Sequence, residues 1–167
     1  MLLHYFKSKK NKDKVLSNKI YNAILTMSKK LVNSKDYFKN KDFGTSFEIF
    51  SIFLIIYIKS IRDLKINNYK LINQNLIDLF INDLDFSLRE QGIGDMSLGK
   101  YVKAYVKKFY FRLSFFDKNL NNDNLEDISN FINKLKFLEI EHSDNLAEFI
   151  LDNYIKIKLD IKSKYLQ

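Results

Sequence analysis

The sequence contains no cysteine and no proline, and only four of its 167 residues are glycine. The lack of cysteine excludes a disulfide scaffold, a thiolate zinc site, an iron–sulfur cluster and catalysis by a cysteine nucleophile. The scarcity of proline and glycine removes the residues that make the turns of β-sandwiches and barrels. The composition therefore favours long helices joined by few turns.

Hydrophobic residues make up 46% of the chain and aromatic residues 15%, which excludes disorder as a description of the whole protein. The length fits one domain, and no repeat or flexible linker marks a second. Apolar residues recur at helical spacing in six stretches, about 15–32, 47–63, 71–91, 98–116, 125–140 and 146–163. We predict an all-α fold, a single compact domain of about six helices over residues 13–163, with a flexible basic tail at 1–12 and a short tail at 164–167.

The most apolar stretch is Phe47–Ile61, in which Glu48 and Lys59 bracket only ten uncharged residues. This is about half of the length needed to cross a bilayer. A helix that is apolar on every side is more typical of the centre of a soluble bundle. We therefore favour burial inside the protein over insertion into lipid.

The helix expected at 71–91 has two apolar faces, since Leu79 and Phe86 point away from the main apolar arc. This pattern predicts a helix sandwiched between two layers. On its polar stripes, Asp85 and Arg89 lie four residues apart and can form an ion pair. Gly92 suits the left-handed position that ends this helix, and Asp95 or Ser97 is expected to cap the next one.

Arg112 lies on the apolar side of the helix at 98–116 and needs a carboxylate or carbonyl partner there. We predict Asp78, Asp83 or Asp85 as that partner. Asp123 or Asn124 is expected to cap the fifth helix, and Ser143 or Asp144 the sixth.

Residues 1–45 carry eleven lysines and three acids, whereas residues 46–167 carry 17 charges of each sign. A basic N-terminal segment on a neutral body can attract ribosomal RNA or an anionic membrane surface. The alternative is a solvated tail, because lysine outnumbers arginine 25 to 3 throughout the chain. We favour the solvated tail and keep the basic patch open.

Residues for catalysis or metal binding do not converge in this sequence. His4 and His142 are the only histidines, and neither has a second ligand at metal-binding spacing. The acids of residues 78–90 divide between two stripes, and the Gly92-Ile93-Gly94 turn lacks the residues of a phosphate-binding loop. We therefore expect no enzyme activity, no metal, no cofactor and no small-molecule substrate.

The stretch Gln74–Arg112 resembles the ubiquinol–cytochrome c chaperone family, in which D-x-D-x-S-L-R-E-x-G-x-G-D is followed one helix later by F-Y-G-R. The residues that match are Asp83, Asp85, Ser87, Leu88, Arg89, Glu90, Gly92, Gly94, Asp95, Phe109, Tyr110 and Arg112. Upstream, Phe47-Glu48 is similar to a G-R-F-E segment of the family. Three positions depart from the pattern: Ser46 replaces its Arg, Phe53 its His, and Phe111 the Gly of F-Y-G-R.

The resemblance implies a helical, non-catalytic assembly chaperone for the bc1 complex, complex III of the respiratory chain. It implies binding of newly made cytochrome b or of a partner assembly factor, through the motif residues and Phe111. It also points to a bacterial cytoplasmic site peripheral to the inner membrane, and the short apolar opening before the lysine run does not form an export signal. The sequence leaves the oligomeric state open.

Three alternatives to this interpretation remain. Folding alone explains part of the motif, with glycines for a corner and Arg112 as a buried tie, and Phe111 then becomes an exposed aromatic. A small RNA- or ribosome-binding protein that uses the basic N-terminal segment is the rival function, and an unrecognised enzyme is a third.

Overall fold

The computed structural model describes residues 2–34, 36–122 and 124–166, with side chains from residue 12 onward. The elements are α1 (Leu2–Ser34), α2 (Phe43–Asp63), α3 (Tyr69–Glu90), α4 (Asp95–Asn119), a 3-10 turn (Leu120–Asn122), α5 (Leu125–Leu135), a second 3-10 turn (Ile140–His142) and α6 (Ser143–Tyr165). No strand is present among the described residues, although Phe38 and Leu138 form one isolated antiparallel bridge. The prediction of one all-α domain of six helices is confirmed.

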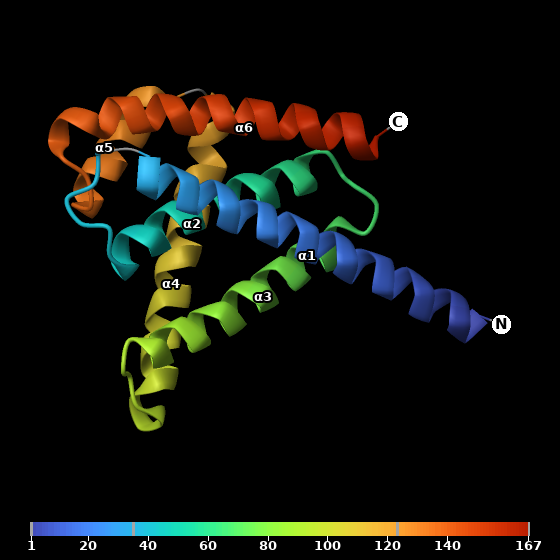
Figure 1. The fold of residues 1–167 in the computed structure, drawn as a ribbon. Coiled ribbons are helices and arrows are strands. Elements are labelled where there is room, and N and C mark those ends of the chain that lie inside the picture. Colours follow the sequence, from blue (N-terminus) through green and yellow to red (C-terminus); the bar gives the residue numbers. More distant parts are fainter. Residues whose placement is uncertain (1, 35, 123, 167) are drawn as a thin grey trace.

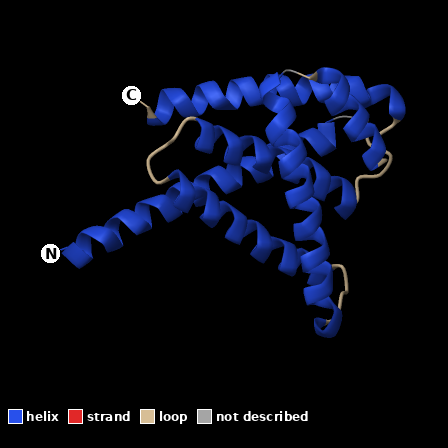
Figure 2. Ribbon diagram, turned by 180° about the vertical axis from the view of Figure 1, so that it is seen from behind, coloured by secondary structure: helices blue, strands red, loops and turns tan. Residues whose placement is uncertain are grey.

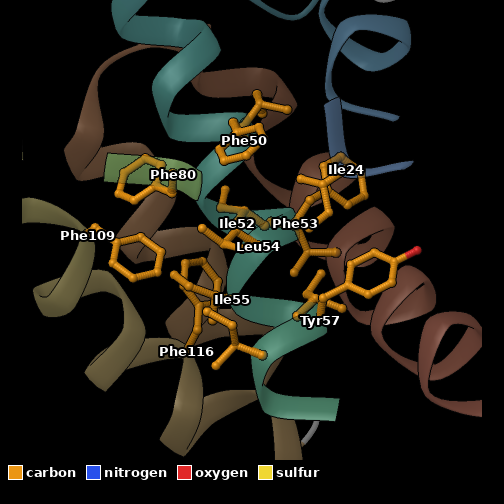
Figure 3. Close-up of a cluster of buried hydrophobic side chains, with 14 of the residues drawn as sticks. Ile24, Phe50, Ile52, Phe53, Leu54, Ile55, Tyr57, Phe80, Phe109 and Phe116 are labelled. Carbon is orange, nitrogen blue, oxygen red and sulfur yellow. The ribbon is translucent and has the colours of Figure 1, made fainter. Parts of the chain in front are cut away.

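Helix α2 is the centre of the fold, in contact with α1, α3, α4 and α6 (Figure 1). From Phe47 to Ile61 only Glu48 escapes full burial, because partners on every side cover the helix. Figure 3 shows its apolar side chains between Ile24 of α1, Phe80 of α3 and Phe109 of α4. By length and composition α2 is the one described helix that could cross a membrane, yet 78% of its apolar window is buried in the protein. The predicted burial is confirmed.

The ends of several helices differ from the prediction. Helix α1 begins at Leu2 instead of near residue 15, and the flexibility expected for residues 1–12 stays a prediction, as does the tail at 164–167. Helix α5 ends at Leu135, five residues early, because Lys136 adopts the left-handed conformation with φ 60°. The turn at Lys136 places Phe137 and Leu138 in the core against Phe38.

Two of the capping predictions are wrong. Gly94, not Asp95 or Ser97, occupies the cap of α4 and offers no side chain. Helix α6 begins at Ser143 after His142, and Asp144 accepts a hydrogen bond from Ser129 of α5 instead of capping. Asn124 caps α5 as predicted, because its side chain accepts from the Asp127 N–H; Asp123 lies outside the described residues.

Helix α3 is covered on its second apolar face only in part, because Leu79 packs against the core and Phe86 does not. Its buried side is formed by Ile72, Leu76, Phe80, Leu84 and Leu88, at helical spacing. On the opposite side Phe86 is 59% exposed, because no element of the described residues covers the outer face of α3 there. Helices α3 and α4 instead form a hairpin whose corner projects away from α5 and α6 (Figure 1).

Candidate functional site

The corner between α3 and α4 carries the glycines of the motif. Gly92 has φ 84°, a conformation that side chains with a Cβ rarely adopt, and it ends α3 as predicted. The Ile93 N–H donates to the Leu88 carbonyl, which closes the end of the helix. Gly94 has an extended backbone and open space around it, so local geometry does not require glycine at that position.

Three motif charges lie together at this corner. Arg89 Nε donates to Asp85 Oδ2 at 2.8 Å, and its Nη1 contacts Asp95 at the start of α4. The hydrogen bond that Arg89 donates to Asp85, and then the one it donates to Asp95, raise the pKa of the Arg89 guanidinium. The predicted Asp85–Arg89 pair is confirmed, but all three side chains face water, where such pairs add little stability. Glu90 is exposed beside them.

Arg112 points inward, as predicted, but its predicted partners are wrong. Its guanidinium donates from Nε and Nη2 to the two oxygens of Glu48 on α2, and its Nη1 donates to the Lys108 carbonyl at 2.9 Å. Only 6% of Arg112 is exposed. Asp78, Asp83 and Asp85 all lie on α3, whereas the guanidinium of Arg112 points toward α2. Glu48 of the F-E segment and Arg112 of the F-Y-x-R segment therefore form one buried ion pair.

The three aromatic residues that precede Arg112 have different surroundings. Phe109 is fully buried, with its ring centroid 5.0 Å from that of Phe80. Tyr110 is 48% exposed and Phe111 is 64% exposed, with Phe131 of α5 as a neighbour at 6.1 Å. The expectation of an exposed Phe111 is confirmed. Phe109 belongs to the core, while Tyr110 and Phe111 are free to contact another molecule.

A cavity of about 470 Å³ opens between α1, the start of α2 and the second half of α3. Its apolar wall is largely aromatic and consists of Phe43, Phe47, Phe50 and Phe80, with Leu25, Val32 and Leu84. Its polar side chains are Ser28, Lys29, Asn33, Lys41, Ser46, Asp83, Ser87 and Glu90. Motif residues from α2 and α3 thus meet at one cavity, which the sequence did not reveal because its walls come from three separate stretches, 25–33, 41–50 and 80–90.

Asp83 anchors one wall of this cavity to α1. The buried Tyr21 hydroxyl donates to Asp83 Oδ2 at 2.9 Å. Burial, followed by the charge of Asp83, raises the pKa of Tyr21 far above its ordinary value. Tyr21 therefore stays protonated and keeps donating, which holds α1 and α3 at a fixed separation across the cavity.

A second charge cluster, built around a buried lysine, was not predicted. Lys59, with 1% of its surface exposed, lies 3.1 Å from both Asp63 and Asp117, and Arg62 also contacts both acids. The hydrogen bond from Arg62 is the main cause that lowers the pKa of Asp117, and Lys59 adds to it. A lysine inside an otherwise apolar run, four residues before an acid, was the available signal. The cluster joins the end of α2 to the end of α4.

The acids considered for a metal have separate partners. Asp78 accepts from Gln74, Asp83 from Tyr21, and Asp85 from Arg89. Within the described residues no three His, Asp or Glu side chains gather in a metal-binding arrangement. The cavity is suited to binding. Its aromatic surface can contact an apolar group, and charged side chains of both signs line it.

Comparisons with known proteins agree with the all-α fold described above. The crystal structure of the Cbp3 homolog from Brucella abortus matches with a TM-score of 0.75 and 21% identity, over 95% of this chain and 88% of that one. This likeness shows the fold. No curated protein matches the sequence. The family model of the ubiquinol–cytochrome c chaperones matches residues 36–152, which is more than two thirds of the chain, and the chain therefore belongs to this family.

Proposed function

We propose that this protein is a non-catalytic assembly chaperone for the bc1 complex that binds newly made cytochrome b. Membership of the chaperone family supports a holding role without substrate turnover. The observation that carries the proposal is the aromatic-walled cavity beside the motif residues of α3. A partner assembly factor is the other candidate occupant of this surface.

A membrane protein that is not yet inserted exposes apolar surface to water, which is unfavourable. Covering that surface is favourable by roughly 25 cal/mol of free energy for each Å² removed from water. A cavity of about 470 Å³ accommodates one or two large apolar side chains. Phe43 is partly exposed in this cavity, and the buried Phe47 and Phe50 form its inner wall. Aromatic rings contact aliphatic or aromatic groups without any specific hydrogen-bond pattern. Such a site suits a client segment that is apolar and not yet inserted or assembled.

The experiment fills the cavity without removing a core contact. Ser46 lines the cavity and its side chain is exposed, so Ser46→Trp places a bulky ring in the space that the client would use. We expect cytochrome b to co-purify with the wild-type chaperone and to be depleted at least about tenfold with the variant, since one lost apolar side-chain site is worth roughly 1.5–3 kcal/mol. Ser163→Trp, at an exposed position of α6 away from the cavity, is the matched control.

Thermal unfolding of both variants confirms that each is folded before the comparison is made. Equal capture by Ser46→Trp and wild type would show that the client binds elsewhere. Absence of cytochrome b from the wild-type complex would contradict the function itself. Capture should change little with salt, whereas an RNA-binding protein would lose its partner steeply as salt rises.

A further inference from the structure

The outer face of α4 combines lysines with exposed apolar side chains. Helix α4 has 25 residues, so it is about 37 Å long. Its solvent side, which we call the α4 outer face, carries Met96, Lys100, Lys103, Lys107, Tyr110, Phe111 and Lys118, all exposed. Viewed from behind, α4 runs down the near side of the molecule with α1 and α6 beyond it (Figure 2).

No acidic side chain of α4 offsets these lysines. At 100° per residue the α4 outer face spans one side of the helix. The two acids of α4 are engaged elsewhere: Asp95 contacts Arg89, and Asp117 contacts Lys59 and Arg62. The four lysines form no ion pair with a described residue. The face therefore presents uncompensated positive charge along most of its length.

The apolar side chains on the same face distinguish it from an ordinary solvated lysine row. Met96 is fully exposed at the corner, Phe111 is 64% exposed, and Tyr110 lies beside it. Lysines that flank exposed aromatic and aliphatic groups are typical of helices at the interface of a bilayer, where the rings enter the headgroup region and the ammonium groups reach the phosphates.

Helix α1 provides an internal contrast. Its exposed side chains from residue 12 onward also include lysines and no exposed acid, but Val15 is its only large exposed apolar residue. Helix α1 lies on the near side in Figure 1 and α4 on the far side. One flat surface cannot meet both faces at once, so a membrane has to select between them.

We propose that the α4 outer face docks on an anionic lipid surface. Lys100, Lys103 and Lys107 pair with lipid phosphates, and Tyr110 and Phe111 enter the headgroup region. The exposed methionine favours a bilayer over RNA, whose bases stack on aromatic rings and whose backbone follows a positively charged groove. The client cavity lies between α1, α2 and α3, so this surface goes beyond the proposed function and does not depend on it.

The test uses the full chain and sedimentation with vesicles of phosphatidylcholine containing one quarter phosphatidylglycerol, against vesicles of phosphatidylcholine alone. The wild type should bind the anionic vesicles, and binding should weaken with salt. The triple change Lys100→Glu, Lys103→Glu, Lys107→Glu should lower the partition constant by more than about 100-fold, since each lysine near such a surface is worth roughly a factor of five. The double change Tyr110→Ser, Phe111→Ser should lower it several-fold with an unchanged salt dependence.

The matched control is Lys19→Glu, Lys29→Glu, Lys30→Glu on α1, which makes the same change in net charge on the opposite side. We expect this variant to retain far more binding than the α4 triple variant. A greater loss with the α1 variant would overturn the proposal, as would equal losses or no binding by the wild type. Loss of binding to an RNA duplex with unchanged vesicle binding in the α4 triple variant would identify the face as an RNA contact instead.

Discussion

The family motif places charged residues in two regions with opposite surroundings. At the corner, Asp85, Arg89 and Asp95 form ion pairs in water. Inside the body, Arg112 and Glu48 form an ion pair shielded from water. The same residue types therefore serve two purposes, since a buried charge needs its partner for the protein to fold, whereas an exposed pair leaves the fold nearly unaffected.

The Lys59 cluster is intermediate between these two regions. Lys59 is buried, but Asp117 and Arg62 are each more than one third exposed. We expect the three regions to rank by burial when their charges are removed, and the following predictions test this order from the largest effect to the smallest.

Arg112→Ala should destabilise the protein by about 3–5 kcal/mol, because the change leaves Glu48 buried without its partner. The measurement is the free energy of unfolding in urea, followed by circular dichroism. The double change Arg112→Leu with Glu48→Leu should recover much of this loss, since it removes both charges. An Arg112→Ala variant as stable as the wild type would show that this ion pair contributes no more than the exposed ones, and would contradict the ranking by burial.

Asp117→Asn should destabilise the protein by a smaller amount, and only above acidic pH. The pKa of Asp117 is lowered in the folded state, so its charge stabilises the fold at a pH above its ordinary pKa, and this contribution is lost as the pH falls through the lowered value. Unfolding curves of wild type and variant should differ at neutral pH and converge below the ordinary aspartate pKa of 3.8. Curves that stay equally far apart at low pH would assign the difference to packing.

Arg89→Ala should leave the unfolding midpoint within experimental error, because its two ion pairs lie in water. Lys103→Ala, an exposed change on α4 that removes no recorded ion pair, is the control. A clear destabilisation confined to Arg89→Ala would show that the corner contributes to folding. If Arg89→Ala folds normally but captures less cytochrome b, the exposed charges of the motif take part in partner binding.

Much of the fold follows from spacing along the chain. Periodicity located all six helices, and the left-handed turn at Gly92 was predictable because glycine tolerates positive φ. The same logic placed Arg112 on the inner side of α4. Local pattern is enough for these features because each depends on residues within one or two helical turns.

Features that depend on distant residues were not predictable from spacing. The Arg112 partner lies 64 residues away on α2, and no periodicity relates the two positions. The early end of α5 depends on Lys136 adopting positive φ so that Leu138 can pair with Phe38. Predicting the cavity required knowledge of which helices are neighbours, and Phe86 is exposed because none of the described helices packs over it.

The position of α2 has a consequence for synthesis on the ribosome. One of its covering helices, α6, is the last to be made, about a hundred residues after α2 is complete. At about 5–20 residues per second this leaves α2 incompletely covered for roughly 5–20 s. During that interval the chaperone is itself a nascent chain with an exposed segment apolar enough to enter a bilayer. On the proposed function, a protein that covers apolar segments of its client therefore needs its own central helix covered while it is being made.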